Sequence, residues 1–131
     1  DLGGGRGITA LPANHVVPAV GYHLDSGRGS LVFTGDTTVN DEFWPIVNRI
    51  ANLRYLIIET AFSNKEREIA VASKHLCPDM LARELAKMRA RPEVFITHLK
   101  PGEGALTMKE VSEAAGRWGP RMLENNQEFT L

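Results

Sequence analysis

Hydrophobic and β-branched residues in the first third of the chain predict extended structure. Segments 8–13, 16–24 and 30–34 are rich in residues that favour strands. The second and third of these segments are separated by Asp25-Ser26-Gly27-Arg28-Gly29, whose residues tolerate the positive φ angles of a turn. The two segments are therefore predicted to pair as a β-hairpin.

From residue 41 onward, helical and extended patterns alternate along the chain. The mostly apolar runs 53–59 and 94–97 are typical of buried strands. Helices are predicted before these runs over 41–51, between them over 66–74 and 78–89, and after them over 107–117. The apolar spacing is clearest in 41–51 and 78–89. A closing hairpin is predicted over 121–131, around the pair Asn125-Asn126. Strands first and β-α alternation afterwards predict a layered α/β fold, a mixed sheet with helices on at least one face.

Composition is that of one globular domain spanning residues 1–131, with 43% apolar and 24% charged residues. The net charge of -1 and the absence of a basic run argue against a dedicated nucleic-acid-binding protein, but not against a small anionic substrate. No apolar stretch approaches the roughly 18 residues of a membrane span. The single cysteine, Cys77, permits no internal disulfide, so a reducing, cytoplasmic location is expected.

Most of the candidate chemistry lies at the ends of predicted elements. His15 precedes a strand, Asp36 and His98 follow strands, and His75 lies just before the helix that starts near Pro78. Polar residues at strand ends gather at one edge of an open sheet, where ligands bind. His23 differs because it alternates with its neighbours inside a strand, and we expect it to face solvent.

Three of these residues, His15, Asp36 and His98, are of the types that zinc takes as ligands. A carboxylate such as that of Asp36 can also bridge two metal ions. Their separations of 21 and 62 residues match no local zinc motif. Each histidine could equally be a hydrogen-bonded residue at a sheet edge, and Asp36 could be a turn or helix-capping aspartate.

Five short segments occur in an order that points to a family. They are HVVPAVGY at 15–22, LVFTGDT at 31–37, IETAF at 58–62, HL at 75–76 and ITHLK at 96–100. With them the chain resembles the metallo-β-lactamase superfamily, and within it the class II cyclic-nucleotide phosphodiesterases, with the tRNA 3′-processing nucleases as cousins. The FTGDT and THLK segments are common to much of the superfamily, whereas the HxxPAxGY and ETxF segments point to the phosphodiesterase branch.

The resemblance implies a role for each candidate residue. His15 would be a ligand of a first zinc ion, Asp36 the carboxylate that bridges two zinc ions, and His98 a ligand of the second. His75 would contact the scissile phosphate and protonate the leaving oxygen. Glu59 matches a position that could orient a histidine from behind the metal ligands.

One departure from the family is large. The His-x-His-x-Asp-His motif, which supplies ligands to both metals from the N-terminal half, is absent. The resemblance therefore implies the C-terminal half of an αββα sandwich, with helices on one face of its sheet, and the chain begins with Asp1 rather than Met, as a piece of a longer protein would. A lone half would expose strand residues such as Val16, Val20, Leu31 and Phe33, so its own N-terminal half or a second copy is the expected partner.

The function expected from this resemblance is part of a zinc-dependent phosphodiesterase that hydrolyses 3′,5′-cyclic nucleotides and is inactive without the missing half. Two alternatives stay open. One is another hydrolase of the superfamily, either an RNA 3′-processing nuclease or a thioester or lactone hydrolase, and the low basic content speaks against the RNA version. The other is a half-fold that dimerises and serves as a non-catalytic interaction module.

Overall fold

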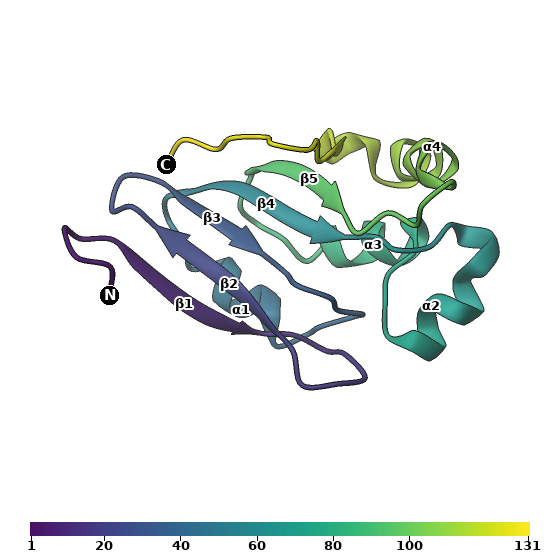
Figure 1. Ribbon diagram of the computed structural model, residues 1–131, viewed down its shortest axis with the longest axis horizontal. Coiled ribbons are helices and arrows are strands. Elements are labelled where there is room, and N and C mark those ends of the chain that lie inside the picture. Colours follow the sequence, from purple (N-terminus) through teal and green to yellow (C-terminus); the bar gives the residue numbers. More distant parts are fainter.

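Residues 1–131, all described by a computed structural model, form one mixed six-stranded sheet whose spatial order follows the chain (Figure 1). The strands are β1 Gly7–Pro12, β2 Val20–Asp25, β3 Ser30–Phe33, β4 Leu53–Glu59, β5 Glu93–Thr97 and β6 Arg121–Met122. β2 is antiparallel to its neighbours β1 and β3, and β3 to β6 are parallel. The predicted hairpin is confirmed as the β2–β3 pair, and the predicted strand over 53–59 has the bounds of β4.

The helices cover one face of this sheet. They are α1 Phe43–Val47, α2 Arg67–Ser73, α3 Pro78–Leu85 and α4 Gly104–Ala115, with 3-10 turns η1 Asn64–Glu66 and η2 Gly116–Trp118. Figure 1 shows α1 and α3 behind the sheet, with α2 beyond the ends of β3 to β5. Their apolar side chains and those of one sheet face form a core of 17 buried residues. Even the longest helix, α4, is too short to cross a membrane.

The opposite face of the sheet is only partly covered. A small cluster of Leu31, Ile57 and Phe95 is packed there against the C-terminal residues Phe129 and Leu131. Toward the β1 edge the same face is open, since Ile8, Val20 and Tyr22 are 46%, 45% and 41% exposed. The sheet is therefore one layer with helices on one side and an apolar surface on the other, as predicted.

The predicted strand over 16–24 is shorter in the structure, because β2 begins only at Val20. Pro18 has no N–H for a strand ladder, and residues 13–19 form the loop between β1 and β2. His15 consequently lies in this loop, three residues after the end of β1 and five before the start of β2. Val16 is an exposed loop residue rather than part of the sheet face.

The predicted hairpin over 121–131 is wrong. Only Arg121–Met122 is extended, and it pairs in parallel with β5. The turn at Asn126 is present, with a φ of 61°, but no second strand follows it. The chain instead places the Phe129 ring 4.9 Å from that of Tyr55 and 5.0 Å from that of Phe95. Burying this ring on the open sheet face is worth more than extending a two-residue ladder.

His23 is not the solvent-facing residue that the alternation predicted. The register pairs it with Val32, which is fully buried in the helix-covered core, so His23 lies on that same face. Its side chain is half-buried, and its Nε2 atom is buried without a hydrogen-bond partner. Antiparallel register decides which face a strand residue occupies, and the sequence alone did not reveal it.

Candidate functional site

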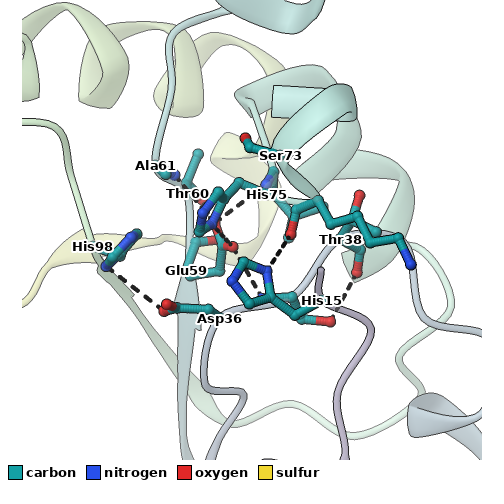
Figure 2. Close-up of polar contacts among 12 residues, drawn as sticks. His15, Asp36, Thr38, Glu59, Thr60, Ala61, Ser73, His75 and His98 are labelled. Atoms are coloured by element: carbon teal, nitrogen blue, oxygen red, sulfur yellow. Dashed lines mark hydrogen bonds and ion pairs between the residues drawn. The ribbon is translucent and has the colours of Figure 1, made fainter. Parts of the chain in front are cut away.

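The candidate residues lie together at one edge of the sheet, where β1, β3, β4 and β5 all end. His15 lies in the loop after β1, Asp36 follows β3, Glu59 is the last residue of β4, and His98 directly follows β5. His75 comes from the loop between α2 and α3. Figure 2 shows the five side chains grouped around one point. Parallel strands bring their carboxyl ends to the same edge, which is how residues distant in sequence meet here.

Three imidazole rings form a row across the site. The ring of His75 lies between the others, with its centroid 4.8 Å from that of His15 and 5.1 Å from that of His98. The His75 and His98 rings are stacked, 19° from parallel. At the end of the row, His98 Nδ1 is 3.7 Å from Asp36 Oδ1 (Figure 2). The structure thus brings together all four residues that the sequence placed at element ends.

Glu59 is completely buried and holds His75 in place. Its Oε1 lies 2.6 Å from His75 Nδ1 and also accepts the N–H of Thr37 at 3.0 Å. Its Oε2 accepts the N–H groups of Ala61 at 3.1 Å and Leu76 at 3.2 Å. This carboxyl group therefore has a partner on every side, and the His75 ring presents Nε2 as its remaining polar atom.

Burial shifts the ionisation of this pair. It raises the pKa of Glu59 to about 7, although the N–H groups of Leu76 and Thr37 and the nearby His98 pull in the other direction. Burial also lowers the pKa of His75, helped by His15 and opposed by Asp36. The two groups share a hydrogen bond, so the protonation of one depends on that of the other. Perturbed groups of this kind are a feature of catalytic sites.

His15 is oriented by the backbone at the end of α2. Its Nδ1 lies 3.1 Å from the carbonyl oxygen of Lys74 (Figure 2). Lys74 ends α2 in the left-handed conformation, with a φ of 56°, which turns this carbonyl toward the loop that carries His15. With Nδ1 occupied, Nε2 is the nitrogen left to bind a ligand.

Asp36 depends on a glycine for its position. The preceding Gly35 has a φ of 63°, and a Cβ on it would lie 2.6 Å from the carbonyl oxygen of Val20. Gly21 on β2 is equally close, because its Cβ would lie 2.6 Å from the carbonyl oxygen of Phe33. Only glycine permits this contact between β2 and the turn after β3. His98 has a positive φ of 63° as well, a costly conformation for a residue with a side chain.

The donor types fit a metal, but their number is small. A histidine whose second ring nitrogen contacts a backbone carbonyl, as in His15, is the arrangement common to metal-ligating imidazoles. Asp36 and His98 are 43% and 46% exposed and face each other, so both are accessible to an ion. No three His, Cys, Asp or Glu side chains in the chain are grouped closely enough to hold a metal by themselves. The residues present are therefore of types that could supply part of a metal site, but they do not form a complete one.

Two neighbours of the site were not predicted as functional. Phe62 places its ring 5.8 Å from that of His75, and Lys100 Nζ lies 5.9 Å from the Phe62 ring centroid. Both help to line a cavity of about 320 Å³ next to His75 and His98. Their only signal in the sequence is their place inside the segments IETAF and ITHLK.

Comparison with known proteins supports the fold. No protein-family model and no curated protein sequence matches the chain. Among solved structures, the metallo-β-lactamase fold protein YhfI from Bacillus subtilis matches 92% of this chain and 48% of its own, with 24% identity and a TM-score of 0.73. Unliganded PDE1 from yeast matches 92% and 44%, with 14% identity and a TM-score of 0.72. The short form of human tRNase Z (ELAC1) matches 75% and 37%, with 20% identity and a TM-score of 0.63.

These likenesses establish the architecture. The chain has the fold of the C-terminal half of a metallo-β-lactamase-type αββα sandwich, with its mixed sheet and its helices on one face. It spans about half the length of the YhfI chain. The expected fold is therefore confirmed, and the proteins that share it include a metallo hydrolase from Ignicoccus hospitalis.

Proposed function

We propose that this chain is the C-terminal half of a zinc-dependent phosphodiesterase that hydrolyses 3′,5′-cyclic nucleotides. The observation that supports it most is the row of His15, His75 and His98, with Asp36 beside it and Glu59 behind it, at the ligand-binding edge of a metallo-β-lactamase-type sheet. The three histidines and Asp36 would supply the metal ligands and the proton donor. The buried carboxyl group of Glu59 would orient that donor.

Each metal-binding role falls to a residue with a free donor atom. His15 would hold one zinc ion through Nε2, because the Lys74 carbonyl occupies its Nδ1. His98 would hold the second ion, and Asp36 would bridge the two. When bound, such a pair supplies a water molecule of lowered pKa and a positive clamp on the phosphoryl oxygens.

His75 would donate the proton that the departing 3′ oxygen needs. With Glu59 protonated and hydrogen-bonded to Nδ1, a neutral His75 carries its own proton on Nε2. As Nε2 gives this proton to the leaving oxygen, Nδ1 can take up the proton of Glu59 across the 2.6 Å hydrogen bond. The raised pKa of Glu59, about 7, keeps this proton available at and below neutral pH.

A small substrate suits the surroundings of the site better than a long nucleic acid. The cavity next to His75 and His98 measures about 320 Å³, and Phe62 offers an aromatic ring there for a nucleobase. The ammonium group of Lys100 is held by Glu66 at 2.7 Å, so it adds little free positive charge. The net charge of -1 supports the same preference.

The chain would act only with a partner. Its open sheet face, with Ile8, Val20 and Tyr22 exposed, supports packing against an N-terminal half or a second copy. The same exposed face is what favours the second candidate function, a dimerising half-fold without catalysis. Light scattering tests this partner proposal: we expect a species heavier than the 14.4 kDa chain, and a monodisperse monomer would contradict it.

Cobalt binding tests the metal proposal on this chain alone. We expect Co²⁺ to give visible d–d bands that chelator removes, and Asp36→Ala, which removes the carboxylate assigned to both ions, to abolish them. His23→Ala is the control, because His23 is the one histidine outside the site. Bands that survive Asp36→Ala, or that vanish equally in His23→Ala, would contradict the assignment.

An assay of cyclic-nucleotide hydrolysis distinguishes a phosphodiesterase from a non-catalytic interaction module. We expect no hydrolysis of cyclic AMP by the 131-residue chain alone. Activity should arise when the chain is expressed with any coding sequence upstream of Asp1 that contains a His-x-His-x-Asp-His segment, and His75→Ala should then lower kcat about 10²–10⁴-fold. A completed protein that binds metal but hydrolyses no cyclic nucleotide would refute the substrate.

A further inference from the structure

A second pocket lies at the other end of β5 from the candidate metal centre. It has a volume of about 600 Å³ and is lined by residues 88–92, between α3 and β5, and by Arg117 and Trp118 after α4. Pro92 directly precedes β5, whereas His98 directly follows it. The five-residue strand separates the two places by roughly 16 Å at about 3.3 Å per residue. The pocket is therefore not part of the site described above.

The lining of this pocket carries positive charges that no acidic side chain of the lining neutralises. Arg89, Arg91 and Arg117 all border the cavity, and the lining contains no acidic residue. None of the three arginines takes part in an ion pair within the chain, unlike Arg121 and four of the five lysines. Three unpaired guanidinium groups around one cavity repel one another, and a bound anion would relieve that repulsion.

Nearby acidic residues are held by other partners. Glu93, which follows the pocket segment, pairs with Arg121 on β6. Glu113, one turn before Arg117, lies 3.9 Å from Lys109 on the same face of α4. The carboxylates that could neutralise the pocket are thus engaged elsewhere.

Two contacts hold the pocket in shape. The guanidinium carbon of Arg117 lies 3.9 Å from the centre of the Trp118 ring, and Trp118 packs against the core. On the other side, the backbone N–H of Arg89 donates to Asn48 Oδ1 at 2.8 Å. An arginine that stacks through its flat face keeps its N–H groups free for a planar or tetrahedral anion.

We propose that this pocket binds a small molecule carrying a di- or triphosphate group. Arginine binds phosphate oxygens through paired N–H donors, and three arginines match the charge of such a chain. The volume lies within the range of about 300–1,000 Å³ of small-molecule sites. A long nucleic acid fits less well, because the net charge of the chain is -1 and its sequence contains no basic run.

Calorimetric titration of the full chain with tripolyphosphate and with ATP tests the proposal, at low salt and with EDTA present to keep the metal centre empty. We expect saturable binding of both. The double variant Arg91→Gln/Arg117→Gln should raise both dissociation constants about a hundredfold, since each charged hydrogen-bond donor is worth about tenfold or more. Tighter binding of ATP than of tripolyphosphate would assign a base-stacking role to Trp118.

The double variant Arg28→Gln/Arg83→Gln is the matched control, because both arginines are exposed, unpaired and outside the pocket. It should change either constant less than about twofold. His98→Ala should leave binding unchanged, which separates this pocket from the metal centre. Absence of saturable binding, equal losses in the two double variants, loss in His98→Ala, or binding of single-stranded RNA without binding of tripolyphosphate would each overturn the proposal.

Discussion

Two glutamates are buried in this chain, and their surroundings differ. Glu59 ends β4 at the candidate site and is 0% exposed, while Glu84 lies on α3 under α1 and is 2% exposed. The partners of Glu84 are Lys87, the indole N–H of Trp44 at 2.8 Å and the backbone N–H of Asn40 at 3.1 Å.

The difference lies in the side chain that each carboxyl group faces. Glu84 faces an ammonium group, and Asp41 and Glu84 together raise the pKa of Lys87 although burial opposes them. That pair, with the hydrogen bonds from Trp44 and Asn40, serves as a fixed joint between α1 and α3. Glu59 faces an imidazole whose pKa is lowered by burial, and its own pKa is raised to about 7. Burial alone therefore does not distinguish the two glutamates, whereas the side chain that each one faces does.

The largest expected effect is the loss of stability when the contacts of Glu84 are removed. Glu84→Ala leaves the Trp44 and Asn40 donors without an acceptor and Lys87 with Asp41 alone. We expect the free energy of unfolding to fall by about 3–5 kcal/mol. Urea denaturation measures it. Glu113→Ala, which removes an exposed pair on α4, should cost about 0.5 kcal/mol or less; equal costs would contradict the assigned role of the joint.

Glu59 should instead make stability depend on pH. Its folded pKa of about 7 exceeds the ordinary value of 4.5, so the protonated form stabilises the fold below about pH 4.5, and this contribution is lost as the pH rises through 7. We expect the wild-type chain to lose about 1–3 kcal/mol between pH 5 and 8 relative to Glu59→Gln, which does not titrate. If the urea midpoints of the two proteins changed by the same amount across this pH range, Glu59 would not be the cause of the pH dependence.

Trp44 tests a single hydrogen bond at the Glu84 joint. Trp44→Phe keeps an aromatic ring beside Phe43 but removes the indole N–H that donates to Glu84. We expect a loss of about 1–2 kcal/mol in the free energy of unfolding. The control is Trp118→Phe, at a half-buried tryptophan whose indole N–H makes no hydrogen bond within the chain, and its cost should be about 0.5 kcal/mol.

The smallest expected effect is on the titration of His75. Burial already lowers its pKa, and a Glu59→Gln change removes the acidic partner of its Nδ1. We expect the pKa of His75, followed by NMR of the imidazole protons, to fall further in Glu59→Gln. The resonances of His23, which has no contact with Glu59, serve as the internal reference. A rise in the His75 pKa would show that the pair does not titrate together.

Much of the fold could be predicted from local pattern. The apolar run of β4, the DSGRG turn of the hairpin and the proline that starts α3 lie where the residues indicated, because each depends on neighbours in the chain. Predictions that needed a distant partner were less accurate. The hairpin over 121–131 does not form because β4 and β5 offer Phe129 a better surface, and the face of His23 was set by its register with β3.

The candidate site shows the same division. The residues at strand ends could be found in the sequence, and the resemblance to the metallo-β-lactamase superfamily proposed a histidine-orienting role for Glu59. The roles of His15, Asp36 and His98 as metal ligands remain predictions that cobalt binding will test. Nothing in the sequence indicated that His75 would lie between His15 and His98, since the three come from different loops.

By itself, then, the sequence determined the order of strands and helices, the turn glycines and the residue types at the strand ends, because these follow from backbone conformation and the polarity of near neighbours. Only the tertiary structure decided which side chains meet. The contact of Glu59 with His75 spans 16 residues and that of Trp44 with Glu84 spans 40, and the arginine pocket joins segments on either side of β5 and α4. Such contacts form when layers pack, and packing depends on shapes and registers that no local stretch of sequence contains.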